Sequence, residues 1–595
     1  MPSLLTLATT LAAEHPTTVT TITLLLTTYF LLYRWQLVKT HPDEPPIVPS
    51  AIPFVGHVLG MAIFGGRYVK NLGLKQKSHP LFTLPLPRSR LYIVTDPALA
   101  TSVQRAARTL SFTPLVPRIT QRVLGLDDAT VAIVQRDLDP GPGMPRGFLA
   151  DVHDLVYGAL GPGEELAGLS LGVAEGLARV VEGFVKETFP SSVSSAEEEK
   201  GDRDPGVVLD LMQWIRHFVT VATAELLYGE ENPIALDPGL EAAFWDFDHG
   251  LGSLLMGVWP AVTARRAYRG REALVAALER YLLEGKYLEK EGRKGAAGIV
   301  QRRIEIALRH GWTMRAVARS ELSFLFAGIV NTATTTFWMV LYLFADTTTG
   351  DDNLLSAVRA ELNLNTIANT TSNENTTNTG TNTETNTPTI SLTTLKTASP
   401  TLNALFREAL RHNSDTYSTR LVTESTTLSA PSSSSSPSSD YIYQTQYHLT
   451  AQSVVQISGG TIHNDPRIWG DDVRAFRPGR FLPPSSSISG SGNGNGNGNG
   501  NGNGPEKQIH PASFRAFGGG KTLCPGRHFA TATIQAFVAV IAGTFEIKGA
   551  DTKEIVVPGK EDGVLPVHVL EPKRPVMVKV RVRKGMRRRG WGLVA

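Results

Sequence analysis

The stretch FGGGKTLCPG, from Phe517 to Gly526, contains the only cysteine among the 595 residues. Three consecutive glycines precede Cys524 closely, and Pro525 follows it. Glycine adopts backbone conformations that other residues avoid and lets another group approach the backbone closely, so the stretch predicts a tight loop. The apolar run after the loop predicts a helix with Pro525 at its first position. Cys524 is therefore expected at a helix N-terminus, where the helix dipole and free backbone N–H groups stabilise a thiolate.

A single cysteine limits the chemistry of the chain. An intrachain disulfide and a multi-cysteine zinc or iron–sulfur site are both excluded. Three roles stay open for Cys524: an inert core thiol, a nucleophile, or one thiolate ligand to a metal. A nucleophile needs a general base, and the nearby His528 alone does not identify one.

The bulk composition is that of a large globular protein. Hydrophobic residues make up 42% of the chain and charged residues 19%, enough to bury an extensive core. The net charge of +3 gives no reason to expect nucleic acid as a partner. An unpaired thiol fits a reducing compartment.

The cysteine loop resembles the haem-binding loop of the cytochrome P450 family, whose pattern is Phe-x-x-Gly-x-x-x-Cys-x-Gly-x-x-x-Ala. The residues that match it are Phe517, Gly520, Cys524, Gly526 and Ala530. The resemblance implies a mainly α fold with small β-sheets and one large catalytic domain. It also implies haem b (iron protoporphyrin IX) as cofactor, with Cys524 as the thiolate ligand of the iron and Phe517, Gly520 and Gly526 around the cofactor. One departure is Thr522, which stands where the family usually has an arginine or histidine that contacts a haem propionate.

Three arginines and a glutamate match further elements of the family in the right order. The sequence REALR places Glu408 and Arg411 three residues apart, on one face of a helix, as in the family's Glu-x-x-Arg motif. FRPGRF supplies Arg480, which resembles the arginine that completes a buried Glu–Arg–Arg network. Arg420, in STRLVTE, is placed like the arginine that reaches a haem propionate; an ordinary strand arginine is the alternative. The family's Trp-x-x-x-Arg motif is not visible near residue 150.

A long apolar stretch, Ala316–Asp346, predicts a helix through the middle of the core. It contains AGIVNT, which matches the family's Ala/Gly-Gly-x-Asp/Glu-Thr in two registers. One register puts Asn331 at the threonine position, as in the branch of sterol 7α-hydroxylase and prostacyclin synthase. The other puts Thr332 there, with Asn331 at the acid position. Asn331 and Thr332 are the predicted catalytic residues, and a structural polar pair is the alternative.

The N-terminal region predicts a membrane anchor; a cleaved signal peptide and a buried helix are the alternatives. Pro16–Tyr33 carries no charged residue, and as a helix it spans about 27 Å, close to a hydrocarbon core of about 30 Å. Arg34 and Lys39 follow, which predicts that the rest of the chain faces the cytosol. We therefore expect an anchor over 1–40, a proline-rich hinge over 41–56, and a catalytic domain over 57–595. The expected location is the endoplasmic reticulum membrane, crossed once.

Low-complexity sequence interrupts the C-terminal half. Tracts near 363–389, 424–439 and 484–505 are rich in Asn/Thr, Ser/Thr and Asn-Gly, and none has enough apolar surface to offset ordering entropy. Each is expected to be a disordered surface insertion. Elsewhere, Val207–Gly229 predicts a helix, and Arg90–Thr95, Thr419–Glu424 and Val576–Arg583 predict strands.

The resemblance implies a monooxygenase that inserts one oxygen atom of O₂ into an apolar substrate, such as a sterol, a fatty acid or a secondary metabolite. Electrons would come from NADPH through cytochrome P450 reductase, with cytochrome b5 as a further candidate partner. Arg515, Lys521, Arg527 and His528 would form the basic docking surface for that reductase. The alternative for each of them is a cation that caps a carboxylate or a haem propionate. Two alternatives stay open: a haem-thiolate peroxide isomerase or dehydratase like prostacyclin synthase, and a non-catalytic haem-binding sensor.

Overall fold

The computed structural model describes residues 16–595 except 139, 142, 190–205, 346–353, 368–387, 430–441, 483–508, 552, 553, 566 and 588. Helices dominate it, as the sequence predicts. They are α2 (Pro16–Gln36), α3 (Gly56–Phe64), α4 (Gly66–Lys75), α5 (Pro97–Arg105), α6 (Val116–Leu124), α7 (Asp128–Val134), α8 (Phe148–Ala159), α9 (Glu164–Thr188), α11 (Leu211–Tyr228), α12 (Pro233–Leu236), α13 (Gly239–His249), α14 (Leu251–Met256), α15 (Pro260–Thr263), α16 (Arg265–Leu283), α17 (Gly298–Arg309), α18 (Met314–Phe344), α19 (Leu354–Asn365), α20 (Leu392–Ala398), α21 (Pro400–Asn413), α22 (Gly459–His463), α23 (Pro466–Trp469) and α24 (Arg527–Thr544).

The strands form small sheets, the largest with the order β1-β2-β10-β7-β3. In this sheet β2 and β10 are parallel and the other neighbours are antiparallel. Its strands are β1 (Leu81–Leu86), β2 (Ser89–Val94), β10 (Val454–Ser458), β7 (Tyr417–Val422) and β3 (Leu110–Ser111). A second sheet has the order β11 (Phe545–Gly549), β12 (Met577–Val582) and β4 (Val207–Asp210). A third has the order β13 (Gly592–Val594), β6 (Thr389–Ser391) and β5 (Thr366–Ile367). The fourth pairs β8 (Thr426–Ser429) with β9 (Gln446–Leu449). Arg420 lies on β7, opposite Val455 of β10.

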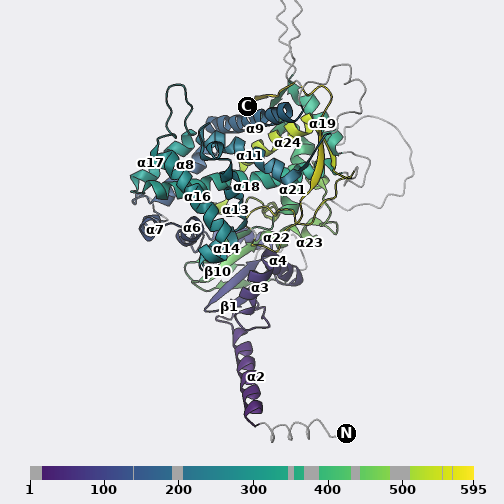
Figure 1. Ribbon diagram of the computed structural model, residues 1–595. Coiled ribbons are helices and arrows are strands. Elements are labelled where there is room, and N and C mark those ends of the chain that lie inside the picture. Colours follow the sequence, from purple (N-terminus) through teal and green to yellow (C-terminus); the bar gives the residue numbers. More distant parts are fainter. Residues whose placement is uncertain are drawn as a thin grey trace, which may run out of the picture.

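The core is built around α18, which packs against α11, α16, α21 and α24 (Figure 1). Thr313 begins the helix by accepting a hydrogen bond from the backbone N–H of Ala316. Every residue from Thr332 to Leu343 is buried. In the described part of the chain, α18 alone is long and apolar enough to cross a membrane, but 72% of its most apolar window is buried inside the protein. α18 is therefore a core helix, as predicted from its sequence.

Helix α2 projects from the body at the end where α3 and β1 lie (Figure 1). It covers the charge-free stretch, and its apolar side chains are exposed, including Leu24, Leu31 and Trp35. The base of the helix is fixed to the body because the Gln36 side chain donates to the carbonyl of Ser50 at 3.1 Å. Its membrane role stays a proposal.

The proline-rich segment after α2, where a hinge over 41–56 is predicted, packs against the body. Glu44 is fully buried and pairs with Arg90 at 3.1 Å. Val48 joins the core, and its N–H donates to the carbonyl of Thr83 on β1 at 2.9 Å. Proline removes donors from this segment, but the remaining backbone groups still dock on the sheet edge.

Three local predictions need correction where strands form. Val207–Asp210 is the strand β4 and not the first turn of a helix, because it pairs with β12. The predicted insertions near 363–389 and 424–439 are ordered at their edges, where β5 and β8 pair with β6 and β9. The rest of these two insertions, and the insertion at 484–505, lie outside the described residues.

Candidate functional site

The cysteine loop folds back on itself so that Cys524 is held at one fixed point. The backbone N–H of Cys524 donates to the carbonyl of Phe517 at 2.9 Å. Gly518 and Gly520 have φ angles of 73° and 62°, in the left-handed region where a side chain would be strained. The Tyr157 hydroxyl of α8 donates to the carbonyl of Leu523 and so attaches the loop to a neighbouring helix.

Cys524 lies just ahead of α24, close to the predicted position. The helix begins at Arg527 with Gly526 as its cap, two residues later than the predicted start at Pro525. Burial is the largest influence on the Cys524 thiol and raises its pKa, while the Gly526 N–H and the Arg527 charge act in the opposite direction. The protein alone therefore does not activate this thiol as a nucleophile.

A cavity of about 580 Å³ opens between the cysteine loop and α18. The predicted residues Cys524, Phe517, Gly526, Arg420, Asn331 and Thr332 all line it. Its lining contains no histidine, aspartate or glutamate among the described residues, so a cysteine nucleophile would have no general base there. Gly520 instead lines an adjoining cavity of about 640 Å³ that shares Arg420 and Thr522 with the first.

Two buried arginines near this cavity, Arg420 in its lining and Arg515 next to the lining residue Ala516, have no acidic partner among the described residues. Arg420 is 4% exposed and Arg515 is 3% exposed, and neither forms an ion pair within the described residues. Arg420 donates to Thr522 Oγ1, and Arg515 donates to Ser418 Oγ at 3.2 Å. Burial lowers the pKa of Arg420; burial, with the nearby Arg420 charge, lowers that of Arg515 to about 10. Buried cations without a counter-ion are costly, so this end of the cavity suits a bound anion.

The residues present fit a haem with its propionates at the arginine end. The buried Arg515 Nε has no hydrogen-bond acceptor in the described structure, and a carboxylate would supply one. The apolar side of the cavity suits the macrocycle, and Cys524 would provide the thiolate ligand. Thr522 does not replace the family's arginine; it orients Arg420 instead.

Arg515 lies inside the protein and not on the predicted basic docking surface, so it fits the alternative of a cation beside a haem propionate. The Gln104 amide oxygen of α5 accepts from its guanidinium at 2.6 and 2.8 Å. Its backbone N–H also donates to His463 Nε2 at 2.8 Å. No local sequence signal separates Arg515 from a surface arginine, because its burial depends on residues far away in the chain.

Asn331 and Thr332 both face the cavity from α18, but their side chains are engaged differently. Asn331 Oδ1 accepts from the backbone N–H of Val569 at 3.0 Å. This fixes the amide, and no described residue accepts from its nitrogen. The Thr332 hydroxyl donates to the carbonyl of Gly328 at 2.9 Å. Both registers of the family motif therefore place a polar group at the cavity.

Glu408, Arg411 and Arg480 meet in one buried network away from the cavity. Arg411 forms two hydrogen bonds with the Glu408 carboxylate, each 2.7 Å long, and Arg480 Nε lies 3.4 Å from Glu408 Oε1. Arg411 also donates to the carbonyl of His463 at 2.8 Å. His463 Nε2 accepts from the backbone N–H of Arg515, so the network supports the segment that leads into the cysteine loop.

Comparisons with known proteins agree with this geometry. The family model described as Cytochrome P450 matches residues 431–579. The chain is 26% identical to "Cytochrome P450 monooxygenase nodJ" of Hypoxylon pulicicidum over 94% of both chains. It is 24% identical to a "Cytochrome P450 monooxygenase" of Gibberella zeae over 86% of this chain and 82% of the relative. A partial match, 26% identical over 25% of this chain and 11% of the relative, is the "Bifunctional cytochrome P450/NADPH--P450 reductase ALT2" of Alternaria alternata.

Proposed function

We propose that the chain is a cytochrome P450 monooxygenase of fungal type, and that it inserts one oxygen atom of O₂ into an apolar small molecule with electrons from an NADPH-dependent reductase; the family match and the named relatives support this. The observation that carries the proposal is the cavity over Cys524, which is mostly apolar, has the buried Arg420 in its lining and has the buried Arg515 next to the lining residue Ala516. Sterols, fatty acids and secondary metabolites all meet this description.

In this proposal each group of residues has its own role. Cys524 would ligate the haem iron, and Arg420 and Arg515 would hold the propionates. When bound, the haem supplies the redox chemistry of oxygen activation, which no amino-acid side chain provides. Phe112, Leu160 and Phe324 are among the lining residues that exclude water. The Asn331 amide nitrogen and the Thr332 hydroxyl would hold a proton-bearing group or water above the site.

Asn331 favours a second candidate reaction, that of a peroxide isomerase or dehydratase. An amide does not relay a proton as a hydroxyl does, and the Val569 N–H further fixes Asn331 in place. A peroxide isomerase or dehydratase needs neither reductant nor proton relay, because its substrate carries the oxidising equivalents. Thr332 on the same helix turn favours the monooxygenase.

The two reactions are separated by turnover of one substrate class under two conditions. Candidate substrates come first from a spectral-shift screen of the purified ferric protein. Each hit is then incubated either with NADPH, reductase and oxygen, or with a lipid hydroperoxide and no reductant. We expect product in the first condition. Product in the second condition alone would show that the isomerase assignment is the right one.

The partner that the family implies is a redox protein, and we propose that it docks near the cysteine loop. Lys521 is exposed there, and Arg527 and His528 are partly exposed, so three of the four residues expected on this surface remain on it. An acidic partner surface would associate faster at low salt. Cytochrome b5 is a second candidate for the same surface.

We propose that α2 anchors the protein in the endoplasmic reticulum membrane, with the catalytic body in the cytosol. The exposed apolar side chains of α2 support this, and so do Ile63 and Phe64 on α3, which are 66% and 51% exposed. Trp259 and Val262, before and within α15, are 80% and 74% exposed. Burying such side chains in lipid contributes about 1.5–3 kcal/mol each.

Deleting residues 1–38 is expected to release a haem-containing protein from membranes. α2 makes few contacts with the body, so the fold should survive without it. Membrane pelleting and the ferrous–CO spectrum measure the two properties separately. A shortened protein without haem would contradict the proposal. A shortened protein that still pellets fully with membranes would show that the body, and not α2, binds the membrane. Substituting Leu24 and Leu25 by serine in the full chain is the milder companion variant.

A further inference from the structure

The segment Val567–Glu571 forms one wall of the cavity through Val567 and Val569. The side that faces α18 is held by two hydrogen bonds. Asn331 accepts from the Val569 N–H at 3.0 Å, and the Trp338 indole N–H donates to the carbonyl of Leu570 at 2.7 Å. The wall is therefore fixed on its inner side by the central helix.

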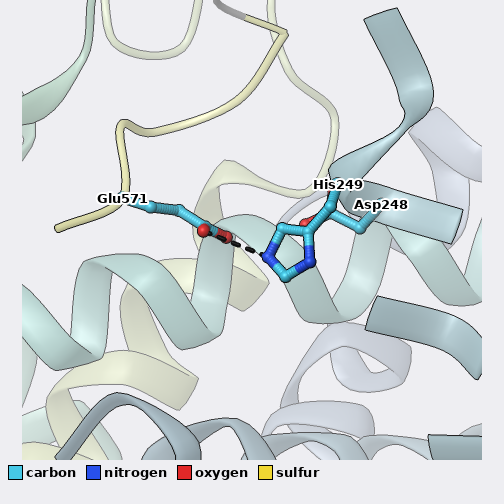
Figure 2. A group of neighbouring side chains, drawn as sticks. All are labelled: Asp248, His249 and Glu571. Atoms are coloured by element: carbon cyan, nitrogen blue, oxygen red, sulfur yellow. Dashed lines mark hydrogen bonds and ion pairs between the residues drawn. The ribbon is translucent and has the colours of Figure 1, made fainter. Parts of the chain in front are cut away.

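The outer side of the same segment is held by charged side chains. Glu571 pairs with Arg216 of α11. Its carboxylate also lies 3.2 Å from His249 Nε2 of α13 (Figure 2). His568 Nε2 lies 3.4 Å from Asp248 Oδ1, also on α13. The charged groups of this cluster are thus Arg216, Asp248, His249, His568 and Glu571, and they link the wall to two helices.

The cluster resembles a metal site by distance alone, because ligand atoms of Asp248, His249 and Glu571 lie within 4.8 Å of one another. Arg216 argues against a metal. Its guanidinium already pairs with Glu571 and lies 3.1 Å from His249 Nε2, the atom that a metal would need. Arg216 is itself held over the Trp245 ring at 4.2 Å. Asp248 and Glu571 carry two negative charges, and Arg216 carries one positive charge. One proton on a histidine therefore makes the cluster neutral, whereas a divalent metal ion would leave it with a net positive charge.

We propose that Glu571 is a positioning residue that clamps the Val567–Val569 wall to α11 and α13, and thereby sets how tightly the cavity holds a bulky ligand. The proposal rests on the proposed function, because it takes this cavity as the substrate pocket. A wall held on both sides is already ordered before a ligand arrives, so less entropy is lost on binding. Backbone bonds from Leu570 N–H to the Asn413 carbonyl and from Glu561 N–H to the Glu571 carbonyl, each 2.8 Å long, remain without the Glu571 carboxylate. The wall then has fewer restraints, so a bulky ligand must supply more of the ordering.

The protonation of the cluster predicts the direction of a pH effect. Burial opposes ionisation of Glu571, but the His249 hydrogen bond and the Arg216 charge outweigh it and bring the pKa of Glu571 to about 2. The hydrogen bond with Glu571 raises the pKa of His249, against the effect of burial. A histidine with a raised pKa contributes fully below its ordinary value and loses that contribution as the pH rises through the raised value. The clamp should therefore weaken as the pH rises above the ordinary histidine pKa of about 6.5.

The test compares two ligands of the haem protein with similar basicity and different size, pyridine and 4-phenylpyridine, by Soret titration of the full-length chain. In Glu571→Gln, we expect 4-phenylpyridine to bind about tenfold more weakly and pyridine to bind within about twofold of the native chain. The native affinity for 4-phenylpyridine should fall as the pH rises, and this dependence should flatten in the variant. Glu571→Asp, which keeps the charge, should recover part of the affinity.

Arg574→Gln is the matched control, because it removes an exposed charge three residues further along the chain. It should bind both ligands as the native chain does. If Glu571→Gln does not retain haem, His249→Asn gives the same readout, with a smaller loss and a flattened pH profile. Equal affinities and pH profiles in the native chain and in a folded clamp variant would overturn the proposal. Neither ligand undergoes turnover, so this result is independent of whether the reaction is oxygenation or isomerisation.

Discussion

Replacing Cys524 by serine is expected to abolish the strongly red-shifted Soret band of the ferrous–CO complex and all reductase-dependent turnover. The chain has no other cysteine, so no second thiolate can take the position. A thiolate donates electron density to the iron and so favours O–O cleavage, and a serine oxygen is a poorer donor. The measurement is the ferrous–CO difference spectrum of the purified variant, scaled to its haem content.

Thr531→Ser is a suitable control for this variant. Thr531 lies on α24 close to Cys524, and its hydroxyl donates to the carbonyl of Arg527 at 2.7 Å, a bond that serine preserves. The control should keep the native spectrum. A Cys524→Ser protein with the native red-shifted band would show that Cys524 is not the ligand.

Replacing Glu408 by glutamine is expected to lower the free energy of unfolding by about 3–5 kcal/mol. Arg411 and Glu408 are 1% and 0% exposed, so the change leaves a buried guanidinium without its counter-ion. Chemical denaturation followed by circular dichroism measures the effect, and loss of the Soret band at lower denaturant should accompany it. The His463 link predicts that the cysteine loop loosens early in this variant.

The exposed helical pair of Glu182 and Lys186 provides the comparison. Their side chains are 43% and 70% exposed, so Glu182→Gln should change the stability by at most about 0.5 kcal/mol. If Glu408→Gln costs no more than this control, the buried network is not the support that its geometry indicates.

Local patterns predicted the parts of the site that a short stretch of chain determines. Glycines with left-handed φ angles and a cysteine before a helix specify the loop around Cys524 from local sequence alone, independently of distant contacts. The three-residue spacing of Glu408 and Arg411 on α21 specifies their pairing in the same way. The apolar sequence of α18 predicts its place in the core, because a helix without a polar face must be buried.

Features that depend on distant contacts could not be predicted in this way. Arg515 is buried because Gln104 and Ser418 come from two other parts of the chain. The Asn331 amide is fixed by Val569, and the charged clamp joins α11, α13 and the C-terminal segment. Val207–Asp210 has a helix-like apolar pattern but becomes a strand because β12 lies beside it. In each case the partner, and not the local pattern, determines the outcome.

Turnover under isotopically labelled dioxygen tests the central claim most directly. A substrate from the spectral-shift screen is incubated with the full-length protein, NADPH and reductase, and the product is analysed by mass spectrometry. A monooxygenase predicts one labelled oxygen atom in each product molecule, and no product without reductant. Product without the label, or product formed only from a hydroperoxide in the absence of reductant, would contradict the assignment.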